Sequence, residues 1–341
     1  MTAAPSLCVG EAIAQLVRPI YPRYANRYGT LHGGYAAWWL LETGAMAAVR
    51  AARGYAVLGA IEHLYIHSPG RLGENVFVYA AVIGSTEHTL DVAAVAVAEP
   101  VGGGAARLVA TSLQTYVAVD EEVRSRRHGV RVAPCGRWQG EEDLYRVHLG
   151  WLERRRRLLP EARGKAGELL ASGIPGVGRI ESLHVVSMED TFTLPGVLDA
   201  ARLFYLIDQV AAVAAIKSLG GPVVTAGFDE AFFLSPARLG DIVSIDAALT
   251  GAGRTSVEAL LRVRIERPSR DEQSLMAILY ATLVSIGDDG RPAPPRRRPE
   301  IPAELQEGYL ERRRRRSEAR RRAEEMAEAL LSLVRSRGLV V

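Results

Sequence analysis

Residues 26–42 read Asn-Arg-Tyr-Gly-Thr-Leu-His-Gly-Gly-Tyr-Ala-Ala-Trp-Trp-Leu-Leu-Glu, and the rest of the chain is arranged around this stretch. It begins in a polar turn, passes through His32-Gly33-Gly34 and becomes an apolar helix that continues to about Arg53. Glycines at a helix start let a ligand approach N–H groups that have no partner within the helix. These groups suit a polarised carbonyl or an oxyanion. A plain turn before a core helix gives the same pattern, so both interpretations stay open.

A second copy of these surroundings follows later in the chain. Residues 68–74 (Ser-Pro-Gly-Arg-Leu-Gly-Glu) recur as residues 235–241 (Ser-Pro-Ala-Arg-Leu-Gly-Asp), so position 69 falls on position 236, a displacement of 167. The same displacement carries Gly29 onto Gly196. A register without gaps over roughly ninety positions indicates a tandem duplication of one domain.

The composition is that of an ordinary globular protein. The 341 residues allow two domains, and with 48% hydrophobic and 24% charged residues each can bury a core. The net charge of +3 indicates no particular partner. Cys8 and Cys135 are too few for a metal cluster and predict a reduced, intracellular setting. No signal peptide and no long apolar run is apparent, so we expect a cytoplasmic protein without membrane insertion.

Each copy predicts one long helix followed by four antiparallel strands, an α+β unit in which a curved sheet wraps the helix. The first domain (residues 1–120) has a strand at 11–20, the helix at 33–53, and strands at 57–68, 74–84, 89–99 and 106–120. The second domain (residues 179–290) has a strand at 179–189, the helix at 198–219, and strands at 223–234, 241–250, 256–266 and 275–286.

Two Arg-rich helices lie outside these units. The connector (residues 121–178) predicts a helix over 141–159 that ends at Pro160, and the C-terminal part (residues 291–341) predicts a linker and a helix over 303–337. Interspersed glutamates and an apolar stripe favour a solvated helix that packs on its own domain over a nucleic-acid-binding helix. We therefore expect no nucleic-acid partner.

A column-by-column comparison of the copies isolates the candidate chemistry. The first copy keeps an amide and a glycine-rich helix start, whereas the second copy keeps a carboxylate within its helix. A buried carboxylate without partners costs several kcal/mol, so Asp208 needs either a satisfied structural role or a functional one. The complementary losses favour one composite site. The paired columns are Asn26 with Thr193, His32 with Asp199, Gly33-Gly34 with Ala200-Ala201, and Leu41 with Asp208.

These motifs resemble those of the acyl-CoA thioesterases of the hotdog fold, most closely the group with two hotdog domains in tandem. The resemblance rests on Asn-x-x-Gly-Thr-Leu-His-Gly-Gly, the repeated Ser-Pro-x-Arg-Leu-Gly turn, Val224-Thr225-Ala226 and residues 253–258. It implies two hotdogs that join their sheets edge to edge, with active sites between them. It also implies that an Asn of one hotdog works with an Asp of the other, which by motif are Asn26 and Asp208.

The resemblance implies hydrolysis of fatty acyl-CoA to free acid and CoA, with no cofactor beyond the CoA of the substrate. Asp208 would act as general base or nucleophile, Asn26 would position water or the carbonyl, and Gly33-Gly34 would polarise the carbonyl. His32 would assist or only stabilise the turn. Arg71 and Arg238 would meet CoA phosphates or form turn ion pairs. Family members commonly form trimers of tandem units, so we expect a homo-oligomer.

The departures from the family pattern remove the second site. The first copy has Leu41 where the family often has Asp, and Glu42 is turned about 100° around the helix. The mirror-image site would need Thr193 with Leu41 or Glu42, and we expect it to be inactive. Two other functions stay open: a non-catalytic acyl-CoA sensor or scaffold, and a hotdog enoyl-CoA hydratase, whose Asp-x-x-x-x-His motif we do not find.

Overall fold

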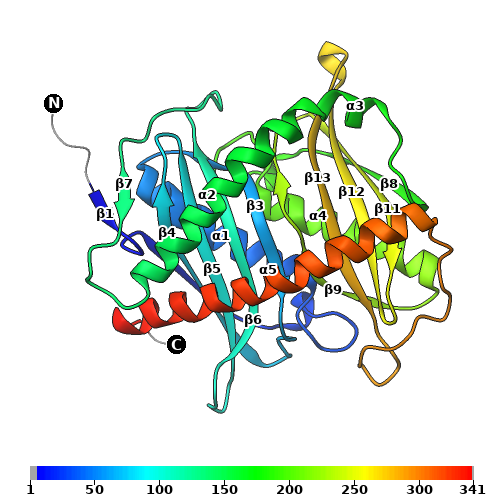
Figure 1. The fold of residues 1–341 in the computed structure, drawn as a ribbon, viewed down its shortest axis with the longest axis horizontal. Coiled ribbons are helices and arrows are strands. Elements are labelled where there is room, and N and C mark those ends of the chain that lie inside the picture. Colours follow the sequence, from blue (N-terminus) through cyan, green and yellow to red (C-terminus); the bar gives the residue numbers. More distant parts are fainter. Residues whose placement is uncertain (1–5, 340–341) are drawn as a thin grey trace.

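The computed structural model describes residues 6–339, in which both halves of the chain share one antiparallel sheet (Figure 1). The halves join where β3 pairs with β9, with Leu64 opposite Phe228. The strand order is β2-β4-β5-β6-β3-β9-β13-β12-β11-β8, with β10 beside β3. The continuous sheet predicted from the duplication is confirmed. Its strands are β2 (Ile13–Pro19), β3 (Ala56–Ile66), β4 (Glu74–Ser85), β5 (Thr89–Pro100), β6 (Arg107–Ala118), β8 (Val177–Val185), β9 (Val223–Phe228), β10 (Ala231–Phe232), β11 (Ile242–Ala252), β12 (Ser256–Arg267) and β13 (Glu272–Ser285).

Helices α1 (Gly33–Ala52) and α4 (Ala200–Leu219) pack against each other on one face of this sheet, behind it in Figure 1. Each helix begins after a side-chain N-cap. The His32 ring accepts a hydrogen bond from the N–H of Gly34, and the Asp199 carboxylate accepts one from the N–H of Ala201. The two predicted core helices, and their side-by-side packing, are confirmed.

Helices α2 (Glu141–Gly164), α3 (Ala166–Ala171) and α5 (Ala303–Ser336) belong to the opposite face, where α5 runs diagonally across both halves (Figure 1). The expectation that the C-terminal helix packs on its own domain is therefore confirmed only in part, because α5 contacts β11 of its own half and also β3, β5 and β6 of the first half. Arg312 and Arg316 fix the first part of α5 to its own half, because both pair with Glu258, a carboxylate buried in the outer face of the sheet. Farther along, Nη2 of Arg320 donates to the carbonyl oxygens of Ala226 and of Ile66 in the first half, where the helix crosses the junction.

The connector helix also differs from the prediction, because α2 continues through Pro160 to Gly164. Proline removes one backbone hydrogen bond from a helix. Here Pro160 lies on the exposed side, and the next turn is held by the pair between Glu161 and Lys165, 2.7 Å apart.

The strand predicted over 223–234 is divided into β9 and β10. Gly227 has a φ of 151°, and a Cβ atom there would lie 2.6 Å from the carbonyl oxygen of Leu64. The chain therefore needs glycine where β9 meets β3, and it leaves the strand at Asp229, which pairs with Arg316.

The expectation of two reduced cysteines is also wrong, because Cys8 and Cys135 form a disulfide. Strands β1 (Ser6–Cys8) and β7 (Arg131–Ala133) pair in parallel and bring these residues together. Sequence spacing could not show this pairing, since 127 positions separate the two cysteines.

No helix within residues 6–339 combines the length and the apolar character needed to cross a bilayer. The remaining short helices are Pro22–Tyr24, Met188–Asp190 and Pro268–Arg270.

Candidate active site

Asp208 lies where the two halves meet, with only 1% of its surface exposed. Its Oδ2 accepts a hydrogen bond of 2.8 Å from the N–H of Gly34, and its Oδ1 accepts one from the hydroxyl of Thr225. The structure thus brings a carboxylate of the second copy to the helix start of the first. Burial raises the pKa of Asp208, and the nearby His32, Thr225 and Gly34 oppose that rise only in part.

The glycine pair is required by this contact. A Cβ atom at Gly33 would lie 2.7 Å from the Cβ of Thr225, and one at Gly34 would lie 2.9 Å from Cδ2 of Tyr205. Both distances are too short for a real contact. The glycines therefore allow α4 and β9 to approach the start of α1, in addition to any role they have toward a ligand.

His32 has a structural role and also contacts the carboxylate. Its Nδ1 lies 3.1 Å from the N–H of Gly34, which it caps, and 3.2 Å from Oδ2 of Asp208. The N–H of Gly34 therefore donates to both Nδ1 of His32 and Oδ2 of Asp208, and this shared donor holds the imidazole and the carboxylate side by side.

Asn26 is held by its own loop. Its Nδ2 donates to Oγ1 of Thr30 at 2.8 Å, and its Oδ1 accepts from the N–H groups of Tyr28 and Thr30. Among residues 6–339, none of its hydrogen bonds reaches Asp208. The structure therefore brings together His32, Gly33, Gly34 and Asp208, whereas a direct partnership of Asn26 with Asp208 stays a prediction.

Comparison with known proteins gives the family. A model of the Thioesterase superfamily matches residues 196–270, which include Asp208. An uncharacterized acyl-CoA thioester hydrolase of Bacillus subtilis is 30% identical over 136 residues, which are 39% of this chain and 79% of that protein. This chain belongs to the acyl-CoA thioester hydrolase family.

Two further similarities span most of the chain. The human cytosolic acyl coenzyme A thioester hydrolase is 25% identical over 292 residues, covering 81% of this chain and 75% of that protein. A solved structure from Lactobacillus plantarum, assigned as an oleoyl thioesterase, matches with a TM-score of 0.53 at 9% identity, over 81% of this chain and 97% of that one. This structure supports the fold alone, which is that of two hotdog units.

Thr225 is the residue of this thioester hydrolase that the sequence comparison did not single out as part of the site. It belongs to Val224-Thr225-Ala226, one of the motifs that carry the family resemblance. Its repeat-equivalent position is Leu58, since 225 − 167 = 58. A polar residue opposite a leucine is the same signal that isolated Asp208, and it was available in the sequence.

The two turn arginines of the hydrolase differ in their surroundings. The backbone N–H of Arg71 donates to Glu74, whose carboxylate pairs with Arg107. The side chain of Arg71 is exposed and has no ion pair within residues 6–339. In contrast, Nη2 of Arg238 donates to the carbonyl oxygen of Glu122 at 2.6 Å. Within the described residues, the guanidinium of Arg71 thus has no ion pair, whereas that of Arg238 is held by a hydrogen bond to the backbone.

The pseudo-symmetric position is nearly closed. Leu41 and Thr193 line a cavity of about 30 Å³, as expected for an inactive mirror site. Asp199 also lines this cavity. Both of its oxygens are engaged, one with the hydroxyl of Thr193 at 2.8 Å and the other with the N–H of Ala201. Glu42 instead pairs with Arg18, 3.1 Å away.

Proposed function

We propose that this chain hydrolyses fatty acyl-CoA to a free acid and CoA at one composite site, formed by Asn26, His32, Gly33, Gly34 and Asp208. The observation that carries the proposal is the buried Asp208 carboxylate, which accepts the Gly34 N–H across the two halves. Relatives named as acyl-CoA thioester hydrolases support the same reaction.

Asp208 supplies the basic group. As a general base, it takes a proton from water while the water oxygen attacks the thioester carbonyl, after which the C–S bond breaks and CoA leaves as a thiolate that is then protonated. As a nucleophile, its carboxylate attacks the carbonyl itself and forms an acid anhydride, which water hydrolyses. Burial raises the pKa of Asp208, and a more basic carboxylate accepts a proton more readily.

The backbone at the start of α1 divides two tasks between its glycines. The N–H of Gly34 already donates to Asp208. The oxygen of the thioester carbonyl therefore accepts a hydrogen bond from the N–H of Gly33 instead. That group is the first of the helix and has no hydrogen bond among the described residues. The dipole of α1 favours negative charge on an oxygen at this position.

Asn26 and His32 complete the proposed mechanism. Asn26 positions the water or the carbonyl. To do so, its Nδ2 must give up the hydrogen bond to Oγ1 of Thr30 and donate to the water or the substrate. Nδ1 of His32 lies 3.2 Å from Oδ2 of Asp208 and accepts from the same N–H of Gly34, so His32 helps to position the carboxylate.

Arg71 is the proposed contact for the CoA phosphates. Its backbone bridges to Thr30, in the loop that holds Asn26, so its free guanidinium lies beside the site. Guanidinium groups bind phosphate oxygens through paired hydrogen bonds. Arg238 is proposed to take part less, because its side chain holds Glu122.

We further propose that tandem units assemble as a trimer. Four large apolar side chains are more than half exposed on the second copy, at edge strand β8 and just after it: Leu183, Val185, Met188 and Phe192. Exposed apolar surface of this kind is typical of an interface. Light scattering that gave a monomer at micromolar concentration would argue against the trimer.

We place the protein in the cytoplasm, like the relative named as cytosolic. The proposed reaction uses no cofactor.

An assay of thiol release across acyl-CoAs of different chain lengths tests the proposed function. We expect steady turnover with at least one chain length. The engaged side chain of Asn26 is the observation that favours the alternative, a sensor that binds acyl-CoA without hydrolysing it. Tight binding without thiol release at every chain length would establish the sensor instead.

A further inference from the structure

Three aromatic side chains, Tyr35, Trp38 and Tyr205, lie together beside the start of α1, and we call them the ring cluster. The ring centroid of Tyr205 lies 4.9 Å from that of Tyr35 and 6.0 Å from that of Trp38. All three residues are half-buried. His32 borders the cluster, with its ring centroid 6.3 Å from that of Tyr35 and 6.0 Å from that of Tyr205. The cluster therefore adjoins the proposed thioester site.

The duplication indicates that the fold itself does not require the whole cluster. The displacement of 167 places Trp38 on Tyr205, so two equivalent residues meet at the junction of the halves. It places Tyr35 on Arg202. At the inactive helix start, Arg202 pairs with Asp190, 2.7 Å away, where the active one has a ring. We therefore attribute Tyr35 to the site and not to the needs of helix packing.

The direction of the substrate follows from the order of groups along the start of α1. Arg71, the proposed contact for the CoA phosphates, bridges to Thr30, which precedes the helix. The N–H of Gly33, the proposed contact for the carbonyl oxygen, comes next. The ring cluster begins after it, one turn into the helix. With CoA toward Arg71 and the carbonyl at Gly33, the acyl group lies toward the ring cluster.

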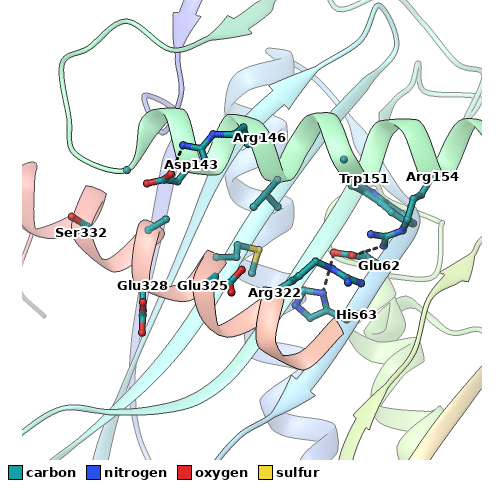
Figure 2. A pocket seen from close by; sticks show the side chains of 15 residues that line it. Glu62, His63, Asp143, Arg146, Trp151, Arg154, Arg322, Glu325, Glu328 and Ser332 are labelled. Atoms are coloured by element: carbon teal, nitrogen blue, oxygen red, sulfur yellow. Dashed lines mark hydrogen bonds and ion pairs between the residues drawn. The ribbon is translucent and has the colours of Figure 1, made fainter. Parts of the chain in front are cut away.

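Other paths for the acyl group are closed. A Cβ atom at Gly33 would already lie 2.7 Å from the Cβ of Thr225, so there is no room toward β9. Ala37 and Phe204, on the buried sides of the two helices, are 0% exposed. The cavity of about 640 Å³ between α2 and α5 is lined by many charged side chains (Figure 2). It lies on the outer face of the sheet, opposite α1 and α4.

Trp38 determines how long an acyl group can be. It follows Gly34 by four residues, which is about 6 Å along a helix, a distance that a straight chain of about five carbons spans. At this point the ring of Trp38 meets that of Tyr205 from the other half. A longer chain must either displace these rings or turn out into water.

We propose that the ring cluster is the acyl-binding surface and that Trp38 and Tyr205 limit the bound acyl group to about six carbons. The inference rests on the proposed function and narrows its substrate class to short-chain acyl-CoA. Each CH₂ group that packs on the rings should raise affinity up to about fourfold, because its apolar surface leaves water. Carbons beyond Trp38 remain in water and should add nothing.

Calorimetric titration of the full chain with thioether analogues of two, four, six, eight and ten acyl carbons tests the proposal. We expect affinity to rise up to the analogue of six carbons and then to stay level or fall. A steady rise through ten carbons overturns the proposal. The matching thioesters are assayed for thiol release. Absence of release at every length would overturn the proposed function, whereas the thioether series would still decide the length limit.

Variants assign the limit to Trp38. Trp38→Ala should raise the affinity for the analogue of ten carbons at least about tenfold and leave that for two carbons nearly unchanged. Trp38→Leu should move the limit by fewer carbons, and it serves if Trp38→Ala does not fold. Met46→Ala is the matched control, since Met46 is also apolar and 38% exposed but lies about two turns farther along α1. A limit that stays in place in both Trp38 variants, or moves equally in Met46→Ala, would contradict the proposal.

Discussion

The start of α1 and the start of α4 are equivalent by duplication, yet they differ in what packs against them. Beside α1, Gly33 and Gly34 lie against a buried aspartate. Beside α4, Ala200 lines a cavity of about 30 Å³ together with Leu41, the counterpart of that aspartate. A Cβ atom at Gly34 would lie 3.2 Å from Oδ2 of Asp208. The glycines and the carboxylate therefore form one unit, and a copy that loses either member has no reason to keep the other.

The largest expected effect comes from removing the carboxylate itself. Asp208→Asn should lower kcat about 10²- to 10⁴-fold, the usual loss when a general base or nucleophile is removed. Glu42→Gln, on the other helix and paired with Arg18, is the matched control and should leave kcat nearly unchanged. If Glu42→Gln proves the damaging change and Asp208→Asn is silent, the carboxylate has been assigned to the wrong half.

The next largest effect on kcat should come from replacing glycine by alanine at the start of α1, compared with alanine by glycine at the start of α4. Gly34→Ala places a methyl group 2.9 Å from Tyr205, so α4 must shift away and kcat should fall about tenfold to a hundredfold. Ala201→Gly makes the opposite change at the equivalent position. It should cost about 1 kcal/mol of stability or less and leave kcat intact. Equal effects of the two variants on kcat would argue that both helix starts are active.

A smaller effect is expected from Thr225→Val, which keeps the side-chain shape and removes the hydroxyl that donates to Asp208. That hydrogen bond lowers the pKa of Asp208, so its loss should raise the pKa further. Activity requires the ionised carboxylate and is lost as pH falls through this pKa. The acidic limb of the kcat profile should therefore lie above the ordinary range of aspartate and move to still higher pH in the variant.

The control for this pH shift is Leu58→Val, at the equivalent position of the other half, which should leave the profile in place. At neutral pH, Thr225→Val should cost about tenfold in kcat or less. A profile that does not move in Thr225→Val would mean that another group controls the ionisation.

The smallest expected effect separates the two turn arginines. Arg71→Ala should raise KM about fivefold or less with kcat preserved, because an exposed charge contact contributes about 1 kcal/mol or less. Arg238→Ala removes the contact with Glu122 and should lower thermal stability without changing KM. A larger rise in KM for Arg238→Ala than for Arg71→Ala would exchange their proposed roles.

The sequence predicted the architecture and much of the site because the duplication constrains both. A shared register places equivalent strands and helices, and complementary losses isolate Asp208 and the glycines. Other features depend on packing between distant segments, which neither register nor periodicity records. Examples are the path of α5 across both halves, the disulfide between Cys8 and Cys135, and the local hydrogen bonds that hold Asn26. Thr225 could have been found from its pairing with Leu58.

The most direct test of one site per chain is a count of binding sites for a non-hydrolysable acyl-CoA, in which a thioether replaces the thioester. Calorimetric titration of the full-length protein should give one molecule bound per chain. The reason is that the cavity beside Leu41 and Thr193 holds only about 30 Å³ and both oxygens of its carboxylate are engaged. Two molecules bound per chain with similar affinity would show that the second helix start is a working site and would contradict the account.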